Sequence, residues 1–179
     1  MSQIEQMPNF AFRLMSAVMA IEDLVHPTID QRVLTFEIRP GMTVVDYGCG
    51  PGRYATRFAK LVGNNGKVYA VDVQPLAIEM VKSKMMKRDL SNVVPVLAKG
   101  YDTGLPDEIA DMVCALDMFF ALREPTTFLR EVHRITKLDG TLIIDDGHQS
   151  RQTTLQKIKV SGCWRVTEET RDHLRCLPV

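Results

Sequence analysis

The stretch Met42-Thr-Val-Val-Asp-Tyr-Gly-Cys-Gly-Pro-Gly-Arg-Tyr54 decides the fold. Residues 43–45 form a short apolar, β-branched run, which predicts a strand buried on both faces. Glycines at alternate positions follow, and over residues 53–62 apolar side chains recur at the three- and four-residue spacing of a helix. A strand, a glycine turn and a helix in this order predict the first unit of a doubly wound α/β sheet. In such sheets the ligand lies beyond the carboxyl ends of the strands.

The glycine turn favours a cationic ligand over a dinucleotide. Asp46 ends the strand directly before the turn, and its negative charge would repel a pyrophosphate but attract an ammonium group. Arg53 also stands where the dinucleotide fingerprint Gly-x-Gly-x-x-Gly needs its last glycine. Both features disfavour a nicotinamide-dependent dehydrogenase.

A second acidic residue ends the next predicted strand. Residues 67–73 read as that strand, and Asp72 lies about 20 residues after the glycine turn. An acid at this place binds the ribose hydroxyls in α/β nucleoside sites. The two acids together predict a positively charged nucleoside that carries an amino-acid moiety.

The segment Val44-Val-Asp-Tyr-Gly-Cys-Gly-Pro-Gly52 resembles the first motif of the class I S-adenosylmethionine-dependent methyltransferases at every defining position. The chain is similar to the branch that includes ubiquinone/menaquinone-biosynthesis and other small-molecule methyltransferases. This resemblance implies S-adenosyl-L-methionine as the cofactor and a Rossmann-like, doubly wound sheet of seven strands in the order 3-2-1-4-5-7-6, with the seventh strand antiparallel. The cofactor-binding residues that it implies are Asp46, Tyr47, Gly48, Cys49, Gly50, Gly52, Asp72, Val73, Tyr101, Asp102 and Leu116.

The predicted adenine loop departs from the family pattern. Relatives carry Gly-Asp-Ala followed by Leu-Pro, and the Asp accepts a hydrogen bond from the adenine amino group. Residues 99–106 read Lys-Gly-Tyr-Asp-Thr-Gly-Leu-Pro, so Tyr101 occupies the acidic position and Asp102 follows it. Either Asp102 takes over this contact, or Tyr101 stacks on or hydrogen-bonds the adenine.

Composition and charge limit the class of protein. The 179 residues, 45% of them hydrophobic, suffice for one domain, expected to span 1–179. The 22 basic residues balance the 22 acidic ones, which argues against a nucleic-acid partner. No apolar run is long enough for a membrane span, and the N-terminus lacks a signal-peptide core. The four scattered cysteines indicate buried free thiols, so we expect a soluble, cytoplasmic protein.

The first 26 residues form a segment rich in Met and Phe with a helical apolar stripe. One interpretation is a helix packed on the edge of the domain. The other is a helical cap or lid over the substrate, because flexible methionines and aromatic rings make adaptable apolar walls. A lid must also pack, so the two interpretations overlap.

The carboxyl ends of the fourth and fifth predicted strands carry the remaining polar candidates. Asp117 follows the fourth strand, and it could orient an acceptor or cap its loop. A helix is predicted from Pro125 to about Lys137, ended by a left-handed Gly140, before a fifth strand over 141–144. That strand runs into an acidic turn with a histidine, which fits substrate contact, a general base or capping of the helix after Ser150 better than a metal site. The acidic turn comprises Asp145, Asp146 and His148.

The function that the resemblance implies is methyl transfer to a small-molecule acceptor by in-line displacement. Such an enzyme mainly aligns its reactants in a dry site, so we expect no metal. A base is needed only when the acceptor must lose a proton. His148 is the first candidate for that base, because histidine titrates near neutrality, and Asp117 is the second. We expect a partly apolar acceptor. The alternative is a non-catalytic regulatory protein of the same fold that binds S-adenosylmethionine or a nucleoside, and the oligomeric state stays open.

Overall fold

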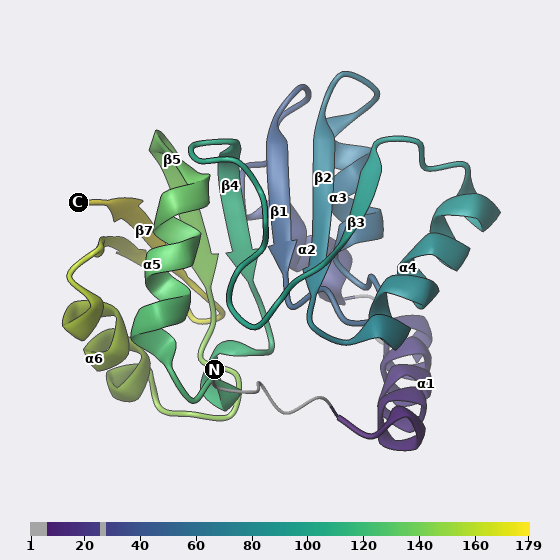
Figure 1. Cartoon of the computed structure of the whole chain (residues 1–179), viewed down its shortest axis with the longest axis horizontal. Coiled ribbons are helices and arrows are strands. Elements are labelled where there is room, and N and C mark those ends of the chain that lie inside the picture. The colour runs from purple at the N-terminus through teal and green to yellow at the C-terminus, as the bar shows by residue number, and fades with distance from the viewer. Residues whose placement is uncertain (1–6, 26–27) are drawn as a thin grey trace.

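A computed structural model describes residues 7–25 and 28–179, and within these ranges seven strands form one sheet (Figure 1). The strand order is β3-β2-β1-β4-β5-β7-β6, with β7 antiparallel to both of its neighbours and the other pairings parallel. The strands are β1 (Thr43–Tyr47), β2 (Lys67–Asp72), β3 (Val93–Leu97), β4 (Ala110–Ala115), β5 (Thr136–Ile144), β6 (Trp164–Glu169) and β7 (Leu174–Pro178). The predicted fold class and strand order are confirmed.

Helices cover both faces of this sheet. The helices are α1 (Asn9–Val25), α2 (Thr28–Leu34), α3 (Ala55–Val62), α4 (Pro75–Arg88), α5 (Pro125–Ile135) and α6 (Arg151–Ser161), with a 3₁₀ turn η1 at Phe119–Ala121. Adjacent valines of β1 are both fully buried but belong to different cores. Val44 packs with residues of α2, α3 and α4, and Val45 packs with residues of α5 and α6. Burial on both faces explains why the decisive stretch reads as a continuous apolar run.

The end of α5 differs from the prediction. The helix stops at Ile135, and Thr136 begins β5 in extended conformation, with its hydroxyl donating to the carbonyl of Val132 at 2.6 Å. Gly140 therefore lies inside β5 and does not adopt a left-handed φ. A β-carbon at Gly140 would meet the side chain of Thr136 at 2.6 Å and the carbonyl of Ala110 at 2.9 Å. This glycine permits close packing between β4 and β5 instead of ending a helix.

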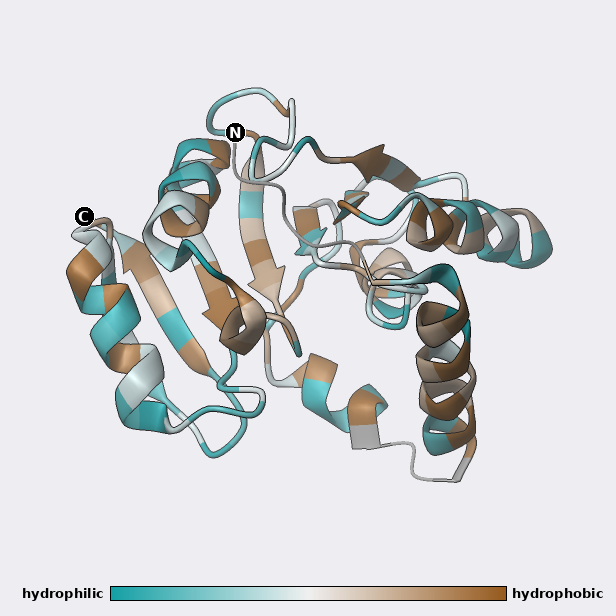
Figure 2. Ribbon diagram, turned by 60° about the horizontal axis from the view of Figure 1, so that its bottom comes forward, coloured by the Kyte–Doolittle hydropathy of each residue, from teal (hydrophilic) through white to brown (hydrophobic). Residues whose placement is uncertain are grey.

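Helix α1 lies at the carboxyl edge of the sheet, next to α4 (Figure 1). Its Phe12 packs in a small cluster with Leu76 and Ala77 of α4. Figure 2 shows that α1, the helix that runs into the grey trace at the lower right, is hydrophobic over most of its length. Phe10 and Leu24 keep more than three quarters of their surface exposed, so α1 has apolar side chains on its outer side as well. No described helix is both long enough and apolar enough to pass through a bilayer.

The two ends of α1 are held by the loops that follow β1 and β2. At its start, the side-chain amide of Gln74 donates to the carbonyl of Met7 and to Asn9 Oδ1, both at 3.0 Å. Near its end, Arg53 of the glycine turn pairs with Asp23 at 2.6 Å. Residues 1–6 and 26 of the predicted cap lie outside the described residues. The described part packs against α4 and also lines a cavity at the carboxyl edge of the sheet.

Candidate functional site

The glycine turn after β1 is held against β2 by backbone hydrogen bonds. The amides of Gly48 and Cys49 both donate to the carbonyl of Val71, at 2.8 and 3.0 Å. Gly48 has a φ of +77°, and a β-carbon there would lie 2.8 Å from Met118 Cγ. The left-handed backbone and this close approach both disfavour a side chain, which accounts for the glycine at position 48.

Asp72 lies at the end of β2 and is fixed by two backbone amides. Its Oδ2 accepts from Gly50 and its Oδ1 accepts from Gln74, each at 2.8 Å. Burial raises the pKa of Asp72, while these amide hydrogen bonds oppose the rise. Each oxygen keeps a further lone pair, so the carboxylate can still accept hydrogen bonds from two hydroxyl groups of a ligand.

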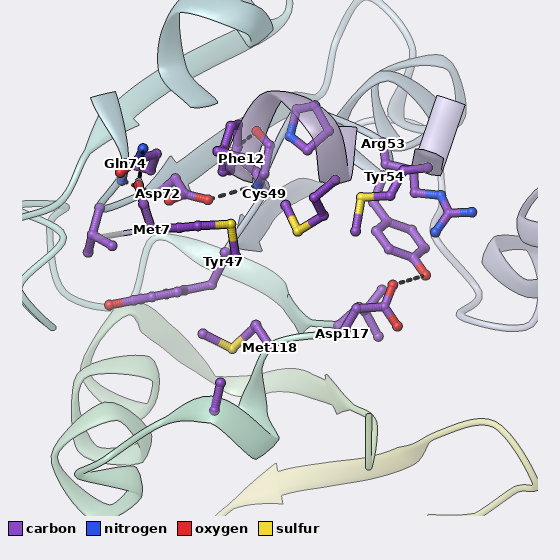
Figure 3. A pocket seen from close by; sticks show the side chains of 18 of the residues that line it. Met7, Phe12, Tyr47, Cys49, Arg53, Tyr54, Asp72, Gln74, Asp117 and Met118 are labelled. Atoms are coloured by element: carbon purple, nitrogen blue, oxygen red, sulfur yellow. Dashed lines mark hydrogen bonds between the residues drawn. The ribbon is translucent and has the colours of Figure 1, made fainter. Parts of the chain in front are cut away.

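A cavity of about 330 Å³ opens above the glycine turn, and we call it the glycine-loop cavity. Figure 3 shows Asp72 and Gln74 at one end of it and Tyr54 with Asp117 at the other. Seven of the predicted cofactor residues lie on its wall, together with side chains of α1 that the prediction from the sequence did not include. The predicted residues on the wall are Tyr47, Gly48, Cys49, Gly50, Asp72, Val73 and Leu116, and the added ones from α1 are Phe12, Met15 and Met19.

Asp46 is not among the described residues on that wall. It is only 1% exposed, and it accepts a hydrogen bond from the backbone amide of Ala55 at the start of α3. Burial raises the pKa of Asp46 to about 8, and its Oδ2 has no hydrogen-bond partner in the described part of the chain. The structure thus places this acid beneath the turn, where it joins β1 to α3. Gly52 also lies off the wall, and a β-carbon added there would meet the side chain of Val81 of α4 at 3.0 Å.

Tyr101 and Asp102 also do not reach the glycine-loop cavity in the described structure. The carbonyl of Tyr101 accepts a hydrogen bond from the Tyr47 hydroxyl at 2.9 Å. The hydroxyl of Tyr101 accepts one from the backbone amide of Glu124 at 3.0 Å. Asp102 is exposed and accepts from the amide of Gly104 at 2.8 Å. Both residues are engaged in holding their own loop, so the choice between them as an adenine contact stays a prediction.

The two predicted catalytic residues share a second cavity. This apolar groove of about 720 Å³ runs between α1 and the turns after β4 and β5, and Leu14 and Val18 form part of its wall. Asp117 and His148 both line it. The exposed His148 ring packs edge-on against Phe120, with ring centroids 4.8 Å apart. The structure therefore brings both candidate bases to one groove that borders the glycine-loop cavity.

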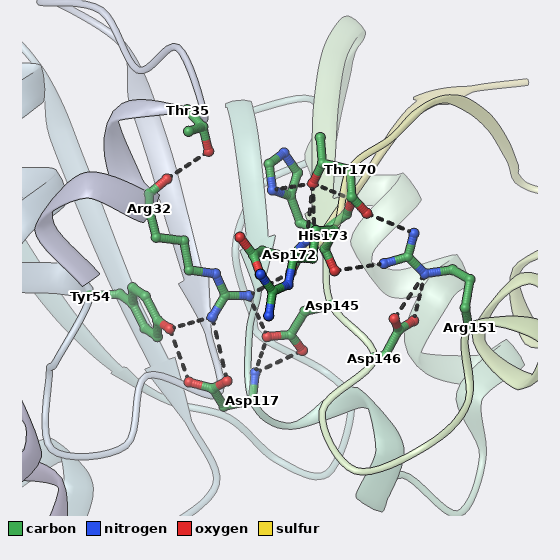
Figure 4. A network of polar contacts seen from close by, with 11 residues as sticks. Arg32, Thr35, Tyr54, Asp117, Asp145, Asp146, Arg151, Thr170, Asp172 and His173 are labelled. Atoms are coloured by element: carbon green, nitrogen blue, oxygen red, sulfur yellow. Dashed lines mark hydrogen bonds and ion pairs between the residues drawn. The ribbon is translucent and has the colours of Figure 1, made fainter. Parts of the chain in front are cut away.

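A third, polar cavity of about 470 Å³ lies on the other side of Asp117, between α2 and the turns after β5 and β6. Arg32 and Asp145 form an ion pair there at 2.7 Å, which the sequence reasoning did not find (Figure 4). They are separated by 113 positions in the chain, and neither belongs to a recognisable motif.

The rest of the acidic turn stabilises local structure. Asp146 pairs with Arg151 at 2.8 Å, and Ser150 caps α6 by accepting from the amide of Thr153. Within residues 7–25 and 28–179, no group of three or more His, Cys, Asp or Glu side chains is arranged to hold a metal ion.

Comparisons with known proteins agree on one family. A family model described as a methyltransferase domain matches residues 38–174. A ubiquinone/menaquinone biosynthesis C-methyltransferase from Shewanella oneidensis is 29% identical over 124 residues, which is 67% of this chain and 48% of that relative. The chain thus spans about half the length of the curated relatives that it matches.

Two solved structures share the fold. A SAM dependent methyltransferase from Aquifex aeolicus is 29% identical, with a TM-score of 0.79 over 84% of this chain and 89% of that one. A chain from Methanococcus maripaludis, described as a candidate S-adenosyl-L-methionine-dependent methyltransferase, has a TM-score of 0.80 over 99% of this chain and 96% of that one. Its identity of 14% limits that likeness to the fold alone.

Proposed function

Because this chain belongs to the methyltransferase-domain family, we propose that it is an S-adenosyl-L-methionine-dependent methyltransferase that acts on a small molecule. The observation that carries the proposal is the carboxylate of Asp72, fixed by two backbone amides at the edge of the glycine-loop cavity. The match covers only 48% of the curated relative, a quinone-biosynthesis enzyme, so the acceptor of that enzyme is not carried over to this chain.

The residues around the glycine-loop cavity fit this cofactor. Asp72 offers two acceptor oxygens for ribose hydroxyls, and the adjoining glycine turn leaves room for a ligand against the main chain. Asp46 contributes a buried oxygen without a described partner next to the same turn. A cationic ligand at the turn would favour the ionised form of this acid, whereas a pyrophosphate would oppose it.

When bound, S-adenosyl-L-methionine supplies a methyl group already activated by a positively charged sulfur. The chain itself has to hold the acceptor in line and keep water out. Phe12, Met15 and Met19 of α1 supply the apolar side of the cavity, so α1 acts as the cap of the site. Methionine side chains adapt their shape to different ligands, which suits a wall that closes over one.

Asp117 and His148 are the proposed bases for an acceptor that must lose a proton. Asp117 lines the apolar groove and the glycine-loop cavity, and its Oδ2 accepts a hydrogen bond from the Tyr54 hydroxyl at 3.0 Å. His148 lines the apolar groove but not the glycine-loop cavity. The position of Asp117 between the two cavities makes it the better placed of the pair.

The acceptor that this site favours is partly apolar. The groove walls include Leu14, Val18 and Phe120, and the groove leads to Asp117. The balanced charge of the chain offers no electrostatic attraction for nucleic acid. The cytoplasm is the proposed location, because all four cysteines are free thiols and three of them are buried.

Calorimetric titration of the purified chain with S-adenosyl-L-methionine, S-adenosyl-L-homocysteine and a nicotinamide dinucleotide tests the cofactor. We expect binding of the first two and none of the third. Incubation with methyl-labelled cofactor and a panel of apolar phenols, amines and thiols, followed by mass spectrometry, tests transfer. Binding of the dinucleotide alone would refute the assignment, and tight cofactor binding without transfer to any acceptor would favour the non-catalytic alternative.

A further inference from the structure

Asp117 has a backbone conformation that is uncommon for its residue type. Its φ is +59°, in the left-handed region that non-glycine residues seldom adopt, although Asp tolerates it better than most. Strained conformations of this kind need support from their surroundings and cluster at functional sites. The structure therefore has to contain the contacts that hold this residue.

Asp145 provides those contacts from the end of β5. The backbone amide of Asp117 donates to both carboxylate oxygens of Asp145, each at 3.0 Å. Asp145 is only 4% exposed, and Arg32 Nη2 donates to its Oδ2 at 2.7 Å. The same Arg32 nitrogen donates to the carbonyl of Asp172 at 3.0 Å, which joins α2 to the turn between β6 and β7.

The contacts close into a ring. Arg32 Nη1 donates to the Tyr54 hydroxyl at 2.8 Å, and that hydroxyl donates in turn to Asp117 Oδ2 at 3.0 Å. Asp117 is thus held twice, by its amide through Asp145 and by its side chain through Tyr54 (Figure 4). Arg32 Nε is buried without a hydrogen-bond partner in the described part of the chain, whereas both Nη atoms of Arg32 are paired. The paired contacts favour one geometry, because breaking any of them would leave a further buried polar group without a partner.

Asp117 stands where this fixed geometry matters. It lines the glycine-loop cavity, the apolar groove and the polar cavity, and of the other described residues only Arg53 does the same. Arg53 is already paired with Asp23 of α1 at 2.6 Å. The Asp117 side chain keeps 37% of its surface exposed, and its Oδ1 lies 3.6 Å from Arg32 Nη1, so a ligand at this junction can still reach the carboxylate.

We propose that Arg32 and Asp145 are positioning residues that hold Asp117 in its left-handed conformation, so that its carboxylate receives a hydroxyl or amine group of the acceptor. The proposal rests on the proposed function for the acceptor, whereas the ring itself does not depend on it. It also gives α2, which lies before the glycine motif, a role in the site.

The charged and titratable groups around Asp145 come from several elements. They are Arg32 from α2, Tyr54 before α3, Asp117 after β4, the neighbouring Asp146, and Arg171, Asp172 and the buried His173 between β6 and β7. Burial and the nearby Asp117 raise the pKa of Asp145 to about 6, against the opposing effect of Arg32. A proton on Asp145 weakens its hydrogen bond from the Asp117 amide, since charged acceptors bind more strongly than neutral ones.

The first test follows the Asp117 amide by ¹⁵N–¹H correlation spectroscopy of the whole chain between pH 5 and 8. We expect a downfield amide proton that moves upfield as the pH falls through about 6. Asp145→Asn should shift it upfield and abolish this titration, and Arg32→Gln should shift it in the same direction. Asp111→Asn is the matched control, since Asp111 likewise accepts a backbone amide (Thr43, 2.7 Å) and pairs with a cation (Lys137, 2.6 Å), but at the opposite edge of the sheet. An Asp117 amide unchanged in both ring variants would overturn the proposal.

The second test separates positioning from general stability. With an acceptor that the natural chain methylates, Asp145→Asn should lower kcat at least about tenfold. It should leave the affinity for S-adenosyl-L-methionine within about twofold and flatten the pH profile near 6. An equal loss of cofactor affinity, or a full kcat in both ring variants, would contradict a positioning role. If the natural chain does not bind the cofactor, the proposed function fails, while the amide shifts still report on the ring.

Discussion

The carboxyl edge of the sheet is built in two different ways. Over β1 and β2 it is held by the backbone, with the amides of Gly48 and Gly50 bound to Val71 and Asp72 no more than 23 positions away. Over β4 and β5 it is held by side chains, and the central pair, Arg32 and Asp145, joins residues 113 positions apart. The first half is fixed by the main chain and depends little on individual side chains. The second half depends on individual side chains, so it is the part that can be specific to one acceptor.

A buried acid in each half illustrates the difference. Among the described residues, Asp46 under the glycine turn accepts a hydrogen bond from the amide of Ala55 alone, and burial raises its pKa to about 8. Asp145 is buried to a similar extent but faces Arg32, and its pKa rises only to about 6. The cationic partner keeps the second acid ionised at neutral pH, whereas the first is mostly protonated there until a positive charge arrives.

The largest expected effect comes from Asp46 and the pH dependence of stability. Its pKa is about 8 in the folded chain and about 3.9 in the unfolded one, so the folded chain binds more protons between these values. Its contribution to stability is therefore complete below pH 4 and is lost as the pH rises towards 8, by up to about 1.4 kcal/mol per pH unit. Asp46→Asn should remove this slope, and urea unfolding at a series of pH values measures it.

The same series with Asp145→Asn sharpens the comparison. The loss of stability from Asp145 should end near pH 6, because its pKa is lower. Superimposable pH profiles for the natural chain and Asp46→Asn would mean that Asp46 is ionised in the fold after all.

The next effect concerns ligand affinity in the backbone-held half. Asp72→Ala removes the proposed charged acceptor of two hydroxyl groups, which should weaken S-adenosyl-L-methionine binding by about 1.5–3 kcal/mol, or roughly 10- to 150-fold. Calorimetry of this variant beside Asp139→Ala, an exposed acid in β5, measures the change. Full affinity in Asp72→Ala would show that the ribose lies elsewhere. Adding Asp102→Ala to the set tests the open adenine contact.

The smallest effect separates backbone strain from contact with the ligand. Gly48 and Gly104 have φ values of +77° and +67°, so alanine at either position should cost roughly 1–2 kcal/mol of stability. A β-carbon at Gly104 meets nothing within 4 Å, whereas one at Gly48 meets Met118 in the cavity wall. Only Gly48→Ala should therefore also weaken cofactor binding. Equal affinities in the two variants would remove the glycine turn from the ligand site.

The sequence predicted the backbone-held half well because its signals are local. A strand, a turn and an acid at the next strand end lie within about 30 positions, and each has a pattern of its own. The predicted helix end at Gly140 was wrong, because a glycine after a helical pattern is the usual sign of a helix end. Its actual role, close packing against the carbonyl of Ala110, depends on a neighbouring strand.

The side-chain-held half was harder to predict. Asp117 and His148 were predicted to lie at the carboxyl edge because both follow strand ends, and both do lie there, while their role as bases stays a prediction. Arg32 carried no such signal, since one arginine in a short helix usually faces solvent. The long separation between Arg32 and Asp145 leaves no spacing rule that could join them. The loop of Tyr101 and Asp102 was placed at the ligand by family analogy, while their hydrogen bonds hold the loop itself.

The attachments of α1 have a consequence for how the site could open. The side-chain amide of Gln74 holds the start of this helix, and its backbone amide donates to the carboxylate of Asp72. Arg53 holds the end of the helix from within the glycine turn. A movement of α1 away from the sheet would therefore disturb Gln74 and Arg53, which both line the glycine-loop cavity. Opening of the cavity and release of a ligand would then be one concerted movement, in which the contacts that hold the ligand weaken as α1 moves away.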